Sequence, residues 1–123
     1  MKIRVYYEDT DAGGIVYHSN YLNFCERARS HLFFDAGRSP ILAEGHFVAK
    51  HLEADYIKSA KLGDILEVKT SLVEMKKASL TLLQQVFREE EKLFEMTIVL
   101  VFIDFAGRMT KIPVPEREFF LAL

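Results

Sequence analysis

The stretch from residue 20 to 36 constrains the fold more than any other part of the chain. Apolar side chains recur there at helical spacing and also spread around the helix, at Tyr21, Leu22, Phe24, Cys25, Ala28, Leu32, Phe33 and Ala36. A helix that is apolar around most of its circumference must be covered by other elements. Gly37 suits the left-handed position that often ends a helix. We therefore predict one long helix around which the rest of the chain folds.

The segments that flank this helix alternate between apolar and polar residues as β-strands do. The candidate strands are one run before the helix and four after it, at residues 2–7, 48–56, 66–72, 79–87 and 93–103. In the second run Val48 falls on the apolar face, which Lys50 interrupts. The last run is apolar on both faces near its end, which is typical of a strand inside a sheet. We predict an α+β fold in which an antiparallel sheet, with a hairpin at residues 75–78, wraps a single helix.

Three further elements are predicted from local signals alone. Ser39 followed by Pro40 predicts a brief helix that ends at Gly45. Residues 109–112 predict a last short strand, and Pro115 predicts the start of a terminal helix. One helix covers only one face of a sheet, so the other face or an edge is expected to meet another subunit.

Composition narrows the possible classes of function. Half of the 123 residues are hydrophobic, 28% are charged and the formal net charge is -2, so one ordinary domain over residues 1–123 is expected and nucleic acid is not an expected partner. The longest apolar run is residues 98–103, which predicts no membrane span, and the amino-terminal stretch has no apolar signal region. The single cysteine, Cys25, can form no intrachain disulfide, so a reducing cytoplasm is the simplest compartment.

The loop before the long helix brings acids close to the helix amino end. Asp9 and Asp11 precede a Gly-Gly pair, and Ser19 or Asn20 can cap the helix that follows. The helix dipole and its free N–H groups favour negative charge, so a carboxylate held there stays ionised and can act as a base or a nucleophile. The same N–H groups can bind a carbonyl oxygen that becomes negative during attack. Acyl transfer is the chemistry that this arrangement favours.

A long motif, YEDTDAGGIVYH, occupies residues 7–18, and shorter matches follow as Asn20-Tyr21, Glu26-Arg27-Ala28-Arg29 and Leu62-Gly63-Asp64. Together these residues resemble the hotdog-fold acyl-CoA thioesterases, in particular the 4-hydroxybenzoyl-CoA thioesterase-like group that includes the Tol-Pal-associated bacterial enzymes. The resemblance extends over most of the chain, to about residue 104. It implies a single hotdog domain, a hydrolase of lipid metabolism, and a homodimer or homotetramer with sites at subunit interfaces.

The resemblance also implies roles for individual residues. Asp11 matches the catalytic carboxylate of the family, and the backbone amide of His18 matches the group that polarises the thioester carbonyl. The residues implied in substrate binding are Gly14 and Tyr17 of the motif and, for CoA on the hairpin, Lys76, Lys77 and Ser79. No metal is expected, and no cofactor is expected because CoA is part of the substrate.

Plainer interpretations of these residues remain open. Asp11 can be a turn residue that bonds its own backbone, which is the usual role of aspartate before glycine. The His18 side chain can be an acid-base group or only a polar cover over the loop. Glu26 and Arg29, three residues apart, are most simply an ion pair on the helix surface. The two lysines of the hairpin can be solubilising charges.

Three functions are compatible with the sequence. The first is a thioesterase that acts on acyl-CoA or on acyl-carrier-protein thioesters, with Asp11 as nucleophile or as general base. The second is a hotdog dehydratase, because Gly45-His46-Phe47 resembles its histidine motif. In those enzymes, however, the histidine loop precedes the long helix, whereas His46 follows it. The third is a non-catalytic protein that binds acyl groups or acts as a scaffold.

Overall fold

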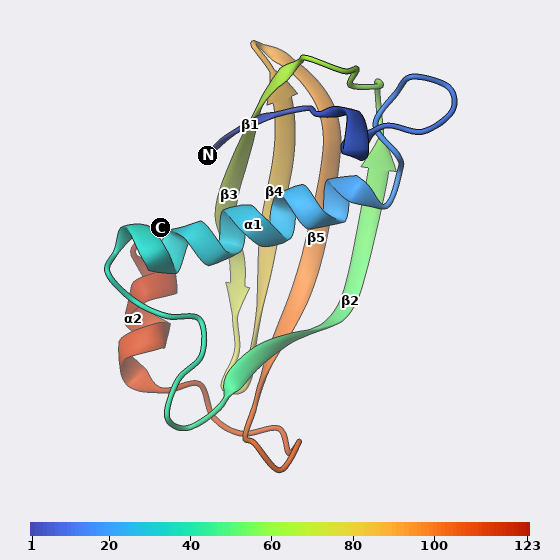
Figure 1. Ribbon diagram of the computed structural model, residues 1–123. Helices are drawn as coiled ribbons and strands as arrows, with labels where there is room; N and C mark the ends of the chain where they lie inside the picture. Colours follow the sequence, from blue (N-terminus) through green and yellow to red (C-terminus); the bar gives the residue numbers. More distant parts are fainter.

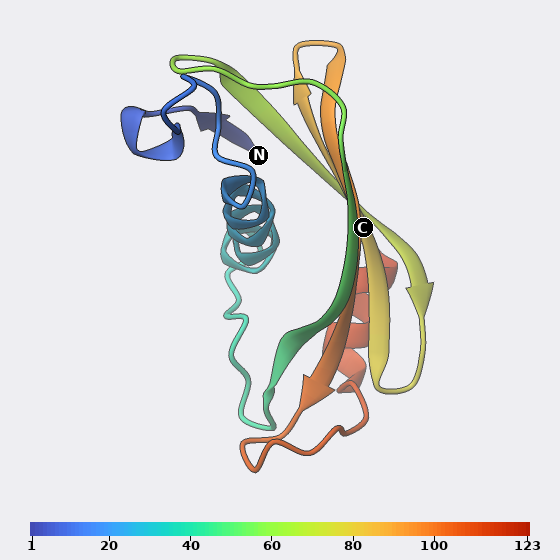
Figure 2. The ribbon, with the colours of Figure 1, turned by 90° about the vertical axis from the view of Figure 1, so that its right-hand side faces the viewer.

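A computed structural model describes residues 1–123. Its elements, in chain order, are β1 (Lys2–Arg4), the 3-10 helix η1 (Tyr7–Asp9), α1 (Asn20–Asp35), β2 (His46–Tyr56), β3 (Ile65–Met75), β4 (Ser79–Arg88), β5 (Glu91–Ile103) and α2 (Val114–Leu121). The strands form one antiparallel sheet in the order β1-β3-β4-β5-β2 (Figure 1). Seen from the side, the sheet curls around α1 (Figure 2). The predicted α+β architecture is confirmed, with β5 inside the sheet.

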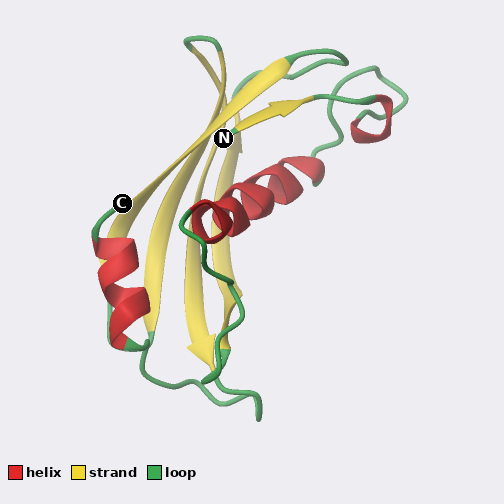
Figure 3. Cartoon of the chain, turned by 60° about the vertical axis from the view of Figure 1, so that its left-hand side comes forward, coloured by secondary structure: helices red, strands yellow, loops and turns green.

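The core lies between α1 and the concave face of the sheet. Phe24 and Cys25 on α1 are fully buried, and so are Leu66, Leu82 and Phe94 on three different strands. Fully burying a side chain of this size contributes about 1.5 to 3 kcal/mol. The buried stripe of α1 therefore faces the sheet, which lies across one side of the helix (Figure 3), and the carboxyl-terminal end of α1 extends beyond β3 toward α2 (Figure 1).

The end of α1 follows the expected pattern. Gly37 adopts a φ of 69°, and its N–H donates to the carbonyl of Phe34 over 2.9 Å. The next N–H, of Arg38, donates to the carbonyl of Phe33 over 2.8 Å. This pair of bonds is a Schellman motif, which satisfies carbonyl groups that the helix cannot bond itself.

The face of β2 that meets α1 differs from the one predicted at the start of the strand. Phe47, not Val48, points toward the core, where its ring lies 5.1 Å from that of Phe102. The pairing of β2 with β5 slips by one residue between Ala49 and His51, at the lysine that interrupted the alternation. A β-bulge of this kind exchanges the two faces of a strand. The assignment of Val48 to the core face was therefore wrong, and residues after the bulge keep the predicted face.

The brief helix predicted at Ser39 is absent, and the segment is an extended loop. The Ser39 hydroxyl accepts a hydrogen bond from the N–H of Ile41 over 3.1 Å, which makes a local turn instead of a helix start. Ile41 forms an isolated bridge with His46 at the beginning of β2, and the N–H of Leu42 donates to the Gly45 carbonyl over 2.9 Å. Pairing with β2 therefore outweighed the local helix signal.

Beyond β5 the chain makes one isolated bridge, between Ile103 and Met109, where a short strand was predicted. The terminal helix is confirmed as α2, with Pro115 in its first turn. Its Phe120 packs against Phe33 at the end of α1, with ring centroids 5.6 Å apart, so α2 lies beside β3 and contacts the end of α1. Neither helix is both long enough and apolar enough to cross a membrane.

Candidate active site

Asp9 fixes the loop that leads into α1. Its side chain is 5% exposed, and its two oxygens accept hydrogen bonds from the N–H of Tyr6 at 2.8 Å and from the Asn20 amide at 2.6 Å. Its main-chain carbonyl accepts the N–H of Tyr17 at 2.9 Å. Asp9 therefore orders the loop. The Asn20 amide already bonds to Asp9, and the Ser19 side chain makes no capping hydrogen bond. The prediction that Ser19 or Asn20 caps α1 with its side chain was therefore wrong.

The uncapped start of α1 leaves polar backbone groups available. No group in the chain accepts a hydrogen bond from the N–H of His18. The His18 carbonyl is held from the other side, because the Tyr56 hydroxyl donates to it over 2.8 Å. An unbonded N–H beside a helix amino end carries partial positive charge, which suits it to bind a developing oxyanion.

Asp11 is a turn residue whose carboxylate also remains accessible. Its Oδ1 accepts the N–H of Gly13 over 2.8 Å, and its main-chain carbonyl accepts the N–H of Gly14 over 3.0 Å. Its Oδ2 makes no hydrogen bond within the chain, and the residue is exposed. Asp11 is therefore both a turn residue and a carboxylate that a ligand can reach.

Two clefts meet at Asp11. A cleft of about 360 Å³ contains Asp11 together with His18, and a neighbouring one of about 540 Å³ contains Asp11 together with Gly14. Tyr17 lines neither cleft; it is exposed and lies against the His18 ring, with centroids 4.6 Å apart. The structure thus brings the carboxylate, the free amide and one glycine of the motif together.

The end of β2 supplies site residues that the sequence did not reveal. Tyr56, Ile57 and Lys58 line the cleft shared by Asp11 and His18. Burial raises the pKa of the Tyr56 hydroxyl, which keeps it protonated as a donor. No local pattern marks Tyr56 as functional, because its role arises only where β2 ends beside the start of α1.

The hairpin residues lie elsewhere. Lys76, Lys77 and Ser79 are in and beside the turn between β3 and β4, at the opposite end of the sheet from the Asp11 loop (Figure 1). Tyr56 is in register with Phe94 and Val86, and Ser79 is seven residues from Val86 along β4, which corresponds to roughly 23 Å. Within one chain, therefore, the hairpin does not join the Asp11 cleft.

His46, the histidine of the dehydratase-like motif, also lies far from Asp11. It begins β2, ten residues before Tyr56, and its ring lies 5.8 Å from that of Phe105. The side chain is not among those that line either cleft at Asp11. Within one chain, therefore, His46 and Asp11 do not form the acid-histidine pair that a dehydratase would need.

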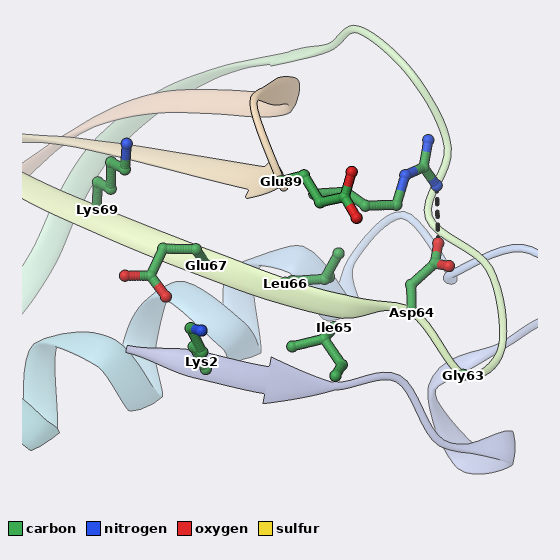
Figure 4. A pocket seen from close by; sticks show the side chains of 9 residues that line it. Lys2, Gly63, Asp64, Ile65, Leu66, Glu67, Lys69 and Glu89 are labelled. Carbon is green, nitrogen blue, oxygen red and sulfur yellow. Dashed lines mark hydrogen bonds and ion pairs between the residues drawn. The ribbon is translucent and has the colours of Figure 1, made fainter.

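The Leu62-Gly63-Asp64 match forms a tight turn beside the largest cleft, of about 620 Å³ (Figure 4). Partial burial opposes ionisation of Asp64, but hydrogen bonds from the Lys61 amide and from Arg88 outweigh it and lower the pKa of the Asp64 carboxyl. The charged residues lining the cleft are three cations and three acids, namely Lys2, Lys69, Arg88, Asp64, Glu67 and Glu89. Because these charges balance, this cleft has no excess positive charge with which to bind an anion.

Two interpretations of α1 residues are now decided. Glu26 and Arg29 do not form the expected ion pair: Glu26 accepts a hydrogen bond from the Ser30 hydroxyl over 3.1 Å, and Arg29 turns inward to Gln84. Cys25 is fully buried, and burial raises the pKa of its thiol to about 12, so it packs as an apolar group. No group of three His, Cys, Asp or Glu side chains is placed to hold a metal ion.

Comparison with known proteins identifies the family of the chain. Residues 13–95 match the family model of the thioesterase superfamily. The chain is 39% identical to the acyl-CoA thioesterase YbgC of Helicobacter pylori, over 100% of this chain and 97% of the relative. The crystal structure of a probable thioesterase from Bartonella henselae superposes with a TM-score of 0.87 at 31% identity, covering 92% of this chain and 97% of that one.

A thioesterase from Thermus thermophilus, solved with coenzyme A and zinc, superposes with a TM-score of 0.86 at 28% identity, covering 99% of this chain and 90% of that one. The family match spans the second half of the motif, the whole of α1 and the strands β2 to β4. The antiparallel sheet wrapped around α1 is the hotdog fold that these thioesterases share. The chain is therefore an enzyme that belongs to the thioesterase superfamily.

Proposed function

We propose that the chain hydrolyses acyl-CoA thioesters to free CoA and a carboxylic acid. The observation that carries this proposal is the meeting of the open Asp11 carboxylate and the unbonded His18 amide in one cleft at the start of α1. The Helicobacter pylori relative, an acyl-CoA thioesterase, supports CoA as the thiol carrier. Acyl carrier protein presents the same thioester chemistry and is the alternative carrier.

The proposed reaction uses these groups in sequence. The thioester carbonyl oxygen accepts a hydrogen bond from the His18 amide, and one such donor contributes roughly 10²- to 10³-fold to the rate. Asp11 then either attacks the carbonyl, which gives a mixed anhydride that water cleaves, or takes a proton from the attacking water. In both routes the C–S bond breaks, CoA leaves as thiolate, and water supplies the new oxygen. No cofactor is required.

Within the superfamily, we place the chain in the 4-hydroxybenzoyl-CoA thioesterase-like group, near the Tol-Pal-associated bacterial enzymes. The support is the motif at residues 7–18, whose turn and helix start build the cleft. Gly14 is proposed to contact substrate because it lines the second Asp11 cleft. Tyr17, whose ring lies against the ring of His18 in the cleft, is also proposed to contact substrate.

The direct test is release of free thiol from a panel of acyl-CoA and acyl-carrier-protein thioesters. We expect steady thiol release from at least one acyl-CoA, with the acyl group recovered as the free acid. Binding of acyl-CoA without thiol release would instead support a non-catalytic acyl-binding protein. Loss of water from a hydroxyacyl-CoA would support a dehydratase.

The hairpin lysines are proposed to contact CoA phosphates across a subunit interface, since they lie far from Asp11 of their own chain. Replacing Lys76 and Lys77 with alanine should raise KM for acyl-CoA by about 3- to 10-fold and leave kcat nearly unchanged. Phosphate contacts bind the ground and transition states alike. Steady-state kinetics measures both constants.

A matched control for this double variant is the replacement of Lys2 and Lys69 by alanine, which removes the same charge from the cleft in Figure 4. We expect its KM to stay within about twofold of the wild type, because exposed charges at a distance are screened. An equal rise in KM for both double variants would show that only overall charge matters, and an unchanged KM for the hairpin variant would place CoA elsewhere.

We also propose that the chain forms a homodimer or homotetramer. β2 is an edge strand of 11 residues, and its Leu52 and Tyr56 side chains are 37% and 51% exposed. Long, exposed edge strands with apolar side chains normally pair with another chain. Light scattering at micromolar concentration should give at least twice the 14.2 kDa mass of one chain. A mass of one chain would contradict this prediction.

A further inference from the structure

The wall segment, residues 57–64 between β2 and β3, borders both clefts at Asp11. No helix or strand lies within it. Four of its residues line the clefts, namely Ile57, Lys58, Ser59 and Leu62. Because the segment has no regular hydrogen-bond ladder of its own, contacts with other elements must set its position.

The wall segment is bonded directly to the Asp11 loop. The N–H of Val16 donates to the carbonyl of Ala60 over 2.9 Å, and Ile15 forms an isolated antiparallel bridge with Lys61. The carbonyl of Ile15 in turn accepts the N–H of Asp11 over 2.9 Å. A shift of the wall segment would therefore move the backbone of Asp11 through successive hydrogen bonds.

Arg88, the last residue of β4, binds the wall segment at several points. Its Nη1 donates to Oδ2 of Asp64 over 2.7 Å and to the Ser59 carbonyl over 3.4 Å. Its Nη2 donates to Oε1 of Glu91 over 2.5 Å, and Oε2 of Glu91 accepts a hydrogen bond from Lys58 over 2.6 Å. One guanidinium thus holds residues 59 and 64 directly and residue 58 through Glu91.

The geometry of Arg88 suits a bracing role better than a purely solubilising one. The side chains of Arg88 and Asp64 are 30% and 23% exposed, and the hydrogen bonds to Glu91 and Asp64 raise the pKa of the guanidinium. A planar guanidinium directs its donors along fixed lines, so bonds to two carboxylates and a carbonyl fix its orientation. Ion pairs near the surface contribute little to overall stability. These contacts therefore fix the position of the wall segment more than they stabilise the whole fold.

We propose that Arg88 is a positioning residue for the reaction at Asp11, because it holds the wall segment and the wall segment holds the Asp11 backbone. The role rests on the thioester hydrolysis proposed for Asp11. A displacement of about 1 Å in a reacting group can lower a rate roughly 10²-fold. Other attachments keep the wall segment folded, such as the bond from the Ala60 N–H to the Tyr21 hydroxyl over 3.0 Å. Loss of Arg88 alone should therefore cost less than that factor.

The kinetic test is the substitution Arg88→Met. It should lower kcat for acyl-CoA about tenfold and change KM less than about twofold, because alignment of Asp11 matters in the transition state while the groups that contact bound substrate remain. The melting temperature should fall by no more than about 3 °C. Steady-state thiol release and thermal unfolding measure these quantities. Unchanged kcat in the folded variant would overturn the proposal.

Amide hydrogen exchange tests the same role without relying on activity. In Arg88→Met, the amides of Val16 and Ala60 should exchange about tenfold faster than in the wild type, whereas those in the centre of β4 and β5 should not change. If the wild type releases no thiol from any thioester, the proposed hydrolysis fails, but exchange still decides whether Arg88 holds the Asp11 loop. Unchanged exchange at Val16 would refute that role whatever the activity.

Lys92→Met is the matched control. Lys92 also lies near the turn between β4 and β5, and it donates to Glu95 over 3.0 Å, outside the wall segment. Its removal should leave kcat within about twofold of the wild type and exchange at Val16 unchanged. Equal losses in Lys92→Met and Arg88→Met would show that the missing charge matters and the brace does not, which would overturn the proposal.

Two further variants sharpen the test. A lysine binds one of the two carboxylates at a time, so Arg88→Lys should lower kcat about threefold. If Arg88→Met does not fold, wild-type kcat in Arg88→Lys would refute the role. Asp64→Asn should also lower kcat, and combining it with Arg88→Met should add no further loss, because both remove the same brace. Fully multiplicative losses in that double variant would contradict the proposal.

Discussion

Replacing Asp11 with asparagine should reduce kcat for thioester hydrolysis by roughly 10²- to 10⁴-fold. A neutral amide is a poor nucleophile and a poor base, so both proposed routes fail. The His18 amide and the Tyr56 contact that holds its carbonyl are unaffected, so acyl-CoA should still bind. Thiol release and equilibrium binding, measured on the same preparation, separate these two effects.

The fold should survive this substitution. The side-chain oxygen of asparagine can still accept the N–H of Gly13, and asparagine suits a turn before glycine. The matched control is Asp9→Asn, in which an NH₂ group must face either the Tyr6 N–H or the Asn20 amide. That buried conflict should cost about 1 to 3 kcal/mol of stability. Wild-type kcat in a folded Asp11→Asn protein would refute the catalytic assignment and direct attention to the side chain of His18.

Replacing Gly45 with alanine should destabilise the protein by about 3 kcal/mol or more, which lowers the melting temperature by ~10 °C. Gly45 has a φ of 154°, and a Cβ there would collide with the carbonyl oxygen of Ile103 and lie 2.9 Å from its carbonyl carbon. The colliding atoms are backbone of β5, so the clash cannot be relieved by rotating a side chain. Thermal and urea unfolding measure the change.

Gly107→Ala is the matched control for this substitution. Gly107 lies in the turn after β5, has a φ of 84°, and offers an added Cβ open space within 4 Å. It should cost only the backbone strain of about 1 to 2 kcal/mol. Equal destabilisation by the two variants would mean that the close approach of Gly45 to Ile103 contributes nothing.

The helix, the main strands and the loop that carries Asp11 could be predicted from the sequence because their signals are local. Residues a few positions apart determine the apolar surface of α1, the alternation of apolar and polar side chains in β3 to β5, and the glycine that ends α1. The motif at residues 7–18 likewise carries Asp11 and the start of α1 in one continuous segment. Structure that depends on residues close together in the chain can be predicted from the sequence.

Long-range pairing decided the rest. Pairing with β5 sets the register of β2, and the slip between Ala49 and His51 exchanges the faces of the side chains at the start of β2. Pairing of the preceding loop with the start of β2 replaced the helix predicted after Ser39. Arg29 turns inward because Gln84, 55 residues away, accepts its N–H, although Glu26 is the nearer partner in sequence. Sequence alone thus determined the elements and the catalytic candidate. Only the tertiary structure decided which faces, partners and cavities they form, because contacts between distant segments outweigh the weak preferences of each segment by itself.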